Sequence, residues 1–367
     1  QGRDAAKGRP DRQAARGRPG RQAGPGGHGR SGRDAARNGA TTYLSDGAPP
    51  FVRQPVEPDI AVEGEFRAGY VALIGRPNVG KSTLLNHLLG TKLAATTHKP
   101  QTTRKNLLGI LMPKGAQLLL LDTPGYHQAK GPLNRYMVDQ ARQAIDDADV
   151  IGYVVEARAD GNITPGNERI LEALKTSDKP VVLLPNKIDR VKDKQGLLLQ
   201  LQAYSQVLGE RMKAAVPISA HRGSGLREAV TELAKALPES PALFDGDTLT
   251  DAPEKSVAAE FVREKVMLAT KDELPYAAAV TIDLFEDARP KIVRIIATIH
   301  VERASQKPIV IGRHGDLVKQ IGTSARRDLE LFLQSKVYLE LHVRVTEEWS
   351  NRPRGLVELG YGQEGTS

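Results

Sequence analysis

One short stretch limits the fold of this chain more than any other: GRPNVGKS, residues 75–82. It satisfies the pattern G-x-x-x-x-G-K-[ST], with a short apolar run at 70–74 before it and leucines at helical spacing after it. A glycine-rich loop between a strand and a helix presents successive backbone N–H groups and a helix N-terminus to a phosphate. The stretch therefore predicts an α/β domain that holds a nucleotide by its phosphates.

Each residue type in this loop has an expected task. We expect Lys81 to reach the β and γ phosphates and the Ser82 hydroxyl to ligate Mg²⁺. The other loop residues expected to surround the nucleotide are Gly75, Asn78, Val79, Gly80 and Thr83.

A second motif follows four consecutive leucines in AQLLLLDTPG. The apolar run predicts a strand covered on both faces that ends at Asp122. We expect Asp122 to hold Mg²⁺ through water and the Gly125 amide to lie near the γ-phosphate. Tyr126 occupies the position where nucleotide hydrolases with this kind of loop often carry a glutamine that orients the attacking water. We expect the Tyr126 ring to pack rather than to orient water.

Two further segments predict selection of the base. In VVLLPNKID, Asp189 can accept hydrogen bonds from guanine, Asn186 can meet the other edge of the base, and the stem of Lys187 can lie across it. Later in the chain, the backbone of Ser219 and Ala220 could contact the guanine carbonyl oxygen. Adenine presents the wrong donors and acceptors to such a site, so these segments predict a guanine nucleotide.

The order of these motifs predicts the fold of the first domain. Lys81, Asp122, Asn186 and Ser219 each follow an apolar run, with helical patterns between the runs. This alternation is typical of a doubly wound α/β domain whose ligand lies at the carboxyl ends of the strands.

A second pattern begins after a Pro- and Asp-rich linker at 241–254. Helical spacing at 258–270 and alternating segments at 277–286 and 292–302 predict a helix and two strands. A G-x-x-G turn at 312–315 follows, which we expect to lie between a short apolar strand and a helix, with a second helix and a last strand beyond it. The predicted α-β-β-α-α-β order is that of an α+β domain.

The turn carries a prediction of RNA binding. Two glycines, Gly312 and Gly315, allow the backbone to approach a single strand, while the basic residues between them supply charge to phosphate. The residues expected to contribute are Ile311, Gly312, Arg313, His314, Gly315, Lys319, Arg326 and Arg327, with a place in the core as the alternative for Ile311 and a solvated helix face for the last three.

Composition adds three limits. Residues 1–40 hold ten Lys/Arg and three Asp, and this +7 leaves only +1 of the net charge of +8 for the rest of the chain. The Gly-, Arg-, Ala- and Pro-rich tail at 1–67 is expected to be disordered, either as a dispensable extension or as an RNA-binding arm. The chain has no Cys, which excludes disulfides, and no run of eighteen apolar residues, so no membrane-spanning segment is predicted.

Together, GRPNVGKSTLLN, KPQTTR, DTPGYH, NKID, SA and the G-x-x-G turn closely resemble the bacterial Era family of translation-factor-class GTPases. The resemblance covers 68–361 and includes Trp349 and the LGY near the end. It implies a GTPase domain at 68–240, a linker at 241–254, a type II KH domain at 255–361 and a short tail at 362–367. It also implies that KPQTTR is the first switch, whose Thr102 or Thr103 closes onto Mg²⁺ and the γ-phosphate.

The resemblance further implies a function. The expected activity is slow hydrolysis of GTP to GDP with Mg²⁺, stimulated by RNA, the ribosomal subunit or K⁺. Asn78 either holds that K⁺ or only shapes its loop. The implied partners are the 3′ end of 16S rRNA and the 30S subunit during its maturation, with no DNA. The implied protein is a cytoplasmic monomer, with peripheral association at the inner face of the membrane left open.

Two rival interpretations share part of this pattern. A ribosome-assembly or tRNA-modifying GTPase of the same class would share the nucleotide motifs, but the KH-like half disfavours it. An RNA-binding protein with an inactive nucleotide domain is opposed by the intact Lys81, Ser82, Asp122 and Asp189.

Overall fold

The computed structural model describes residues 64–126, 130–192, 194–289 and 292–362, all within one compact unit, residues 51–367. The predicted tail therefore lies outside the described residues except at its end, where the first strand already begins at Arg67. No helix in the described part of the chain is both long and apolar enough to cross a membrane.

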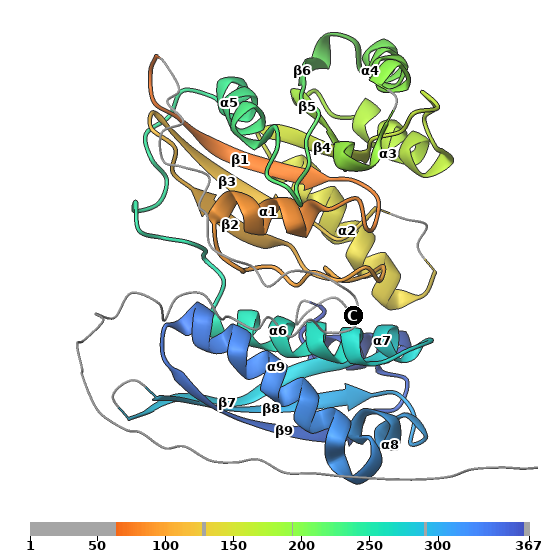
Figure 1. Cartoon of the computed structure of the whole chain (residues 1–367), viewed down its shortest axis with the longest axis vertical. Helices are drawn as coiled ribbons and strands as arrows, with labels where there is room; N and C mark the ends of the chain where they lie inside the picture. Colours follow the sequence, from red (N-terminus) through yellow and green to blue (C-terminus); the bar gives the residue numbers. More distant parts are fainter. Residues whose placement is uncertain (1–63, 127–129, 193, 290–291, 363–367) are drawn as a thin grey trace, which may run out of the picture. The chain divides into compact units, whose positions relative to one another are not determined.

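The first domain is built on a six-stranded sheet of order β2-β3-β1-β4-β5-β6 (Figure 1). All neighbouring strands are parallel except β2, which pairs antiparallel with β3. The strand bounds are β1 Arg67–Ile74, β2 Leu107–Leu111, β3 Ala116–Asp122, β4 Val150–Glu156, β5 Val181–Asn186 and β6 Met212–Ala215.

Helices cover both faces of this sheet, as expected for a doubly wound fold. One buried cluster joins the sheet to α1 and α5, and a second joins its other face to α2, α3 and α4. The helices are α1 Lys81–Leu89, α2 Pro132–Asp147, α3 Pro165–Lys175, α4 Lys194–Leu208 and α5 Leu226–Ala236, with short turns η1 Ile188–Arg190 and η2 Gly209–Arg211.

The second domain holds a three-stranded sheet of order β7-β8-β9, with α6 and α9 packed on one face (Figure 1). Strands β7 and β8 are antiparallel, while β8 and β9 are parallel. The elements are α6 Glu254–Ala269, α7 Leu274–Ala277, β7 Ala279–Arg289, β8 Ile292–Val301, α8 Gln306–Ile311, η3 Arg313–Gly315, α9 Asp316–Leu333, β9 Lys336–Val345, η4 Trp349–Asn351 and α10 Pro353–Glu358.

Three local expectations were wrong. The apolar run before the G-x-x-G turn is the helix α8 rather than a strand. The prediction failed because an apolar run this short is compatible with either a buried helix or a strand. The two helices expected after the turn are one continuous helix, α9, which passes through Gly322 without a break. Between Lys81 and Asp122 the chain forms α1 and then the unexpected antiparallel strand β2.

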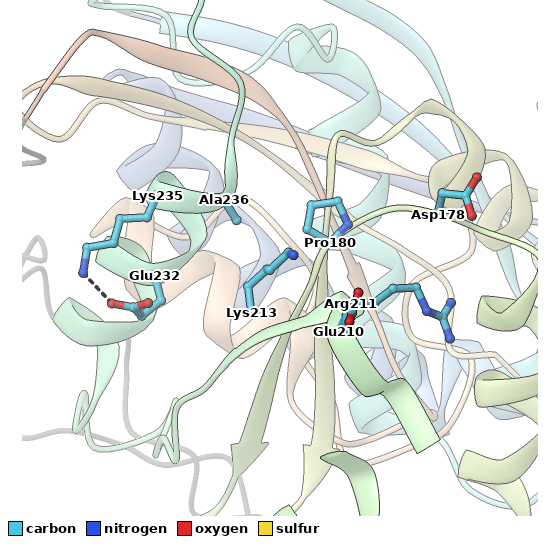
Figure 2. Close-up of a pocket in the computed structure, with 8 residues that line it drawn as sticks. All are labelled: Asp178, Pro180, Glu210, Arg211, Lys213, Glu232, Lys235 and Ala236. Atoms are coloured by element: carbon cyan, nitrogen blue, oxygen red, sulfur yellow. Dashed lines mark hydrogen bonds and ion pairs between the residues drawn. The ribbon is translucent and has the colours of Figure 1, made fainter. Parts of the chain in front are cut away.

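An open pocket in the first domain lies at the amino ends of the strands, opposite the end where the nucleotide is predicted to bind (Figure 2). Pro180 and Lys213 line it from the start of β5 and β6, and Lys235 of α5 is ion-paired there with Glu232. The predicted nucleotide motifs follow the opposite, carboxyl ends of the strands.

Candidate nucleotide site and RNA-binding turn

The phosphate loop is shaped by close packing of its glycines. A side chain at Gly75 would collide with the carbonyl oxygen of Val154, and one at Gly80 would collide with the amide of Asn186. Gly80 also has φ 104°, a left-handed conformation that glycine adopts readily. Helix α1 begins directly after it, so Lys81 and Ser82 stand at a helix N-terminus.

Three oxygen-bearing side chains meet beside this terminus. The Ser82 hydroxyl donates to Asp122 Oδ2 at 2.6 Å, and Thr103 Oγ1 lies 2.9 Å from Ser82 Oγ and 3.1 Å from Asp122 Oδ2. Burial raises the pKa of Asp122, although Lys81 and the two hydroxyl hydrogen bonds oppose the shift. The structure thus brings Ser82, Thr103 and Asp122 together.

The other candidate threonine points elsewhere. Thr102 Oγ1 donates to the Lys99 carbonyl oxygen at 2.7 Å and lies 2.7 Å from Thr97 Oγ1. These contacts hold the turn within KPQTTR at 99–104, the segment predicted to be the first switch. Of the two threonines that spacing left undecided, Thr103 is the one at the oxygen cluster.

Magnesium fits this cluster chemically. Asp122 Oδ1 is buried and has no hydrogen-bond partner, so the carboxylate has an acceptor oxygen to spare. Two hydroxyls and a carboxylate are hard oxygen donors, and Mg²⁺ takes few protein ligands while keeping several waters. The residues that would hold it are Ser82 and Thr103 directly, with Asp122 through water. No group of three or more His, Cys, Asp and Glu that could hold a metal occurs among the described residues.

Lys81 is buried and poised at the phosphate loop. Its Nζ donates to the carbonyl oxygens of Gly75 at 3.1 Å and Arg76 at 3.2 Å. Burial lowers the pKa of Lys81 to about 8, and the Asp122 carboxylate partly opposes this shift. A phosphate bound in the loop would favour the charged ammonium.

The segments predicted to select the base form a connected network. The Asn186 amide donates to the Val79 carbonyl oxygen at 2.7 Å and accepts from the backbone amides of Ala220 and Lys187, each at 2.8 Å. Ser219 donates to Asp189 Oδ1 at 2.6 Å, which lowers the pKa of that carboxyl. The side chain of Asn186 therefore joins the phosphate loop to both base loops, a positioning task that the motif did not predict.

The remaining predicted positions lie around the phosphate loop. Gly125 approaches Pro77 so closely that a Cβ would lie 2.5 Å from the Pro77 nitrogen. The Tyr126 amide donates to the Gly75 carbonyl oxygen at 3.1 Å, and its ring packs partly buried against the core between the sheet and α2–α4. Asn78 donates to the His98 carbonyl oxygen at 2.7 Å, beside the first switch.

The predicted RNA-binding turn is compact and exposed. Gly312 has φ 76° and Gly315 φ 82°, and a Cβ at Gly312 would lie 2.6 Å from that of Leu317. Arg313 and His314 are exposed between them. On α9, Lys319, Arg326 and Arg327 are also exposed, whereas Ile311 is partly buried.

Several contacts of the first switch were not predicted. Arg104 is fully buried and donates to the carbonyl oxygens of Ala278 at 2.8 Å and Tyr276 at 2.7 Å. Arg263 of α6 donates to the Thr102 carbonyl oxygen. The sequence signal was weak, because a basic residue on a helix usually lies on a solvated face.

Comparisons with known proteins agree with this geometry. Residues 70–187 match the family described as 50S ribosome-binding GTPase, and residues 273–350 match the KH domain family. GTPase Era of Geotalea uraniireducens is 48% identical over 301 residues, covering 82% of this chain and 99% of the relative. GTPase Era of Ruminiclostridium cellulolyticum is 42% identical over 298 residues, covering 81% and 98%.

The chain belongs to the Era family of GTPases. It carries a P-loop GTPase domain followed by a KH domain, so the prediction of fold and activity is confirmed. Both rival interpretations are set aside, because Era relatives match across both domains.

Two solved Era structures resemble this chain over its described length. Era in complex with MgGDPNP and nucleotides 1506–1542 of 16S ribosomal RNA has a TM-score of 0.76 at 41% identity, covering 81% of this chain and all of that one. Aquifex aeolicus Era in which one tyrosine is replaced by alanine, bound to GDP·AlF4⁻, has a TM-score of 0.77 at 41% identity, with the same coverage.

Proposed function

We propose that this protein is a GTP-driven switch whose KH domain binds single-stranded 16S rRNA near its 3′ end and thereby assists maturation of the 30S subunit. The observation that carries the switch is the contact of Thr103 with both Ser82 and Asp122, because it joins the first switch to the phosphate loop. A segment with this contact can report whether a γ-phosphate and its metal are bound.

Each part of the nucleotide would be held by a different group of residues. Lys81 and the amides at the start of α1 would bind the β and γ phosphates, while Asp189, oriented by Ser219, would select guanine. When bound, Mg²⁺ would stabilise the negative charge that develops on the phosphate oxygens during hydrolysis. Ser82, Thr103 and Asp122 would hold that ion, and Gly125 would place its amide near the γ-phosphate.

The position that orients water in many GTPases is occupied here by Tyr126. Tyr126 packs against the core, so we propose slow intrinsic hydrolysis that a bound partner accelerates. We further propose that Asn78 helps to hold a K⁺ ion against the nucleotide, since its side chain lies between the phosphate loop and the first switch. The rate in K⁺ should then exceed that in Na⁺, and Asn78→Ala should abolish this difference.

RNA binding would use the turn between α8 and α9. The exposed Arg313 and His314 offer charge to phosphate, and the tight Gly312 allows the backbone to approach the strand. Lys319, Arg326 and Arg327 would extend the basic surface. The Era relative solved with a 16S rRNA fragment supports this choice of RNA.

Crosslinking and sequencing of bound RNA tests the RNA claim. We expect the wild-type chain to recover the 16S rRNA 3′ end, and Gly315→Asp to lose it, because an acid there repels phosphate and strains a position with φ 82°. Gly209→Asp is the matched control, since Gly209 also has positive φ and open space around it but lies in the GTPase domain. Equal recovery from both variants would contradict the proposal.

For location and assembly state we propose a monomer in the cytoplasm, where ribosomal subunits mature. Peripheral association with the inner face of the membrane stays a prediction of the family resemblance alone. Sedimentation of the purified chain tests the monomeric state, and co-sedimentation with vesicles tests the membrane association.

A further inference from the structure

The first switch is held by residues of the second domain. Lys99 donates to the carbonyl oxygens of Met267 and Thr270 at the end of α6, and Arg104 donates to those of Tyr276 and Ala278. Both ends of the segment are therefore attached to backbone outside the GTPase domain. Between them, one side chain of α6 reaches the peptide beside the metal-site threonine.

That side chain is Arg263. It is fully buried, and its guanidinium is paired with Glu260, whose Oε1 accepts from Nε at 3.0 Å. Its Nη2 also donates to the Thr102 carbonyl oxygen, and Nη1 lies 3.0 Å from the Met267 sulfur. Burial opposes the charge, but Glu260 more than offsets it and raises the pKa of Arg263, so the group stays cationic.

The accepting carbonyl belongs to the peptide that links Thr102 to Thr103. Fixing this peptide plane sets where the Thr103 backbone starts and thus where its hydroxyl can lie. Thr103 Oγ1 is the atom found 2.9 Å from Ser82 Oγ and 3.1 Å from Asp122 Oδ2. A charged donor held rigidly by a carboxylate can fix a carbonyl more firmly than a neutral one.

We propose that Arg263 is a positioning residue for GTP hydrolysis: from the KH-side helix α6 it fixes the Thr102–Thr103 peptide so that Thr103 completes the metal site. The inference rests on the proposed role of Thr103 as a magnesium ligand. It makes hydrolysis depend on a residue outside the GTPase domain, with Glu260 as the group that orients Arg263.

Helix α6 also packs in a buried cluster that includes residues of the GTPase domain. Val257, Ala258 and Phe261 of α6 belong to the same buried cluster as Leu88 and Leu93 of the GTPase domain. Helix α6 therefore shares a buried core with the first domain, and the Arg263 side chain reaches the Thr102 carbonyl oxygen from the same helix. The guanidinium itself is fully buried and is held by Glu260 as well as by the peptide.

Single-turnover hydrolysis of GTP by the full chain, titrated with Mg²⁺, tests the proposal. Arg263→Met should lower the rate about tenfold and raise the Mg²⁺ concentration needed for half-maximal rate, because a charged hydrogen bond is lost. The affinity for GDP should be unchanged, since GDP is held by the phosphate loop and base loops. Arg263→Lys should recover part of the rate. Lys255→Met, an exposed charge removed from the same helix, should match the wild type.

A second variant covers the case in which Arg263→Met does not fold. Glu260→Gln keeps Arg263 but weakens its orientation, and should shift the rate and the Mg²⁺ dependence in the same direction by a smaller factor. Unchanged rate and Mg²⁺ dependence in a folded Arg263 or Glu260 variant would overturn the proposal. An equal loss of GDP affinity and rate would also overturn it, because it would indicate a merely structural role.

Thr103→Val separates this inference from the proposed function on which it rests. If Thr103→Val leaves the Mg²⁺ dependence intact, the assignment of the metal site is wrong, and the positioning claim is overturned with it. If Thr103→Val alters that dependence and the Arg263 and Glu260 variants do not, only the positioning claim is overturned.

Discussion

The side-chain amide of Asn186 joins three loops of the nucleotide site. It contacts Val79 of the phosphate loop, the Lys187 amide and the Ala220 amide, all at 2.7–2.8 Å. One residue thereby connects the loop proposed to bind phosphate to the loops proposed to select the base. Its loss should affect binding of any guanine nucleotide, whether or not a γ-phosphate is present.

Asn186→Asp tests this coupling with almost no change in size. The variant keeps the acceptor for Lys187 and Ala220 but sets a carboxylate oxygen against the Val79 carbonyl oxygen in place of a donor. We expect affinity for both GDP and GTP to fall about tenfold or more, and the free energy of unfolding to fall by about 2 kcal/mol. Titration calorimetry and denaturant unfolding measure the two effects. Unchanged affinity for both nucleotides would count against the coupling role.

At the scale of residues, the sequence predicts positions that belong to a motif with fixed spacing. It does not predict side-chain contacts between residues that lie far apart in the chain. The phosphate loop and the strand ending at Asp122 could be placed because their residue spacing follows from the shape of a phosphate and a parallel sheet. The choice between Thr102 and Thr103 could not be made, because it depends on a turn closed by Lys99. Arg263 was invisible, since its partner lies 161 residues earlier in the chain.

At the scale of elements, a buried ionic cluster connects the loop after α1 with α6 and α9. Lys92 contacts Glu264 at 2.7 Å and Asp328 at 2.6 Å, while Lys265 pairs with the same two carboxylates. Lys92 also lies 5.1 Å above the ring centre of Phe261. The two negative charges are thus balanced by two positive charges away from bulk water.

Lys92→Met should destabilise the fold strongly, because it leaves two partly or fully buried carboxylates with a single cation. We expect the free energy of unfolding to fall by about 3 kcal/mol. Lys235→Met removes the partner of Glu232 at the open pocket of Figure 2, and should cost less than about 1 kcal/mol. Denaturant unfolding of both variants gives the comparison. Similar losses in the two would show that burial of the cluster has no energetic consequence.

The same cluster predicts a dependence on pH. Burial raises the pKa of Asp328, but Lys92 and Lys265 more than offset this and hold it below its usual range. A carboxyl with a depressed folded pKa adds stability that is present above its unfolded pKa, about 4, and lost as the pH falls further. The melting temperatures of wild type and Lys92→Met should therefore converge as the pH drops from about 6 to about 3. A constant difference would contradict this origin of the stability.

The elements themselves were predicted unevenly. Long or strongly patterned segments such as α6, β7 and β8 were placed to within a few residues, because their periodicity persists over several turns or alternations. Helix α8 was mistaken for a strand, since six residues rich in Ile and Val satisfy either pattern. Strand β2 was missed because antiparallel pairing with β3 depends on a partner that local sequence does not reveal.

At the scale of the whole molecule, the end of the KH half contacts Arg104, the last residue of the proposed first switch. Trp349 stacks on Tyr361 at 5.5 Å between ring centres, and the guanidinium of Arg104 lies 5.5 Å from the Trp349 ring. Leu133 and Met137 of α2 pack in the same buried cluster. A change in the first switch would therefore alter the surroundings of this aromatic pair.

Trp349 is the single tryptophan of the chain, so its fluorescence can report on that contact. Exchange of GDP for a non-hydrolysable GTP analogue with Mg²⁺ should change its emission, because Arg104 follows Thr103 directly. Arg104→Met should abolish most of the change, and Arg158→Met, which alters an exposed pair with Asp160, should preserve it. Identical spectra of the wild type in both nucleotides would contradict a coupled switch.

The affinity of a single-stranded RNA with the sequence of the 16S 3′ end, measured by fluorescence anisotropy with each nucleotide bound, tests the central claim most directly. We predict binding at least about tenfold tighter with the GTP analogue than with GDP, and loss of this difference in Lys81→Ala. Equal affinity in the two nucleotide states, with Gly315→Asp still weakening both, would leave an RNA-binding GTPase but contradict control of its RNA grip by GTP.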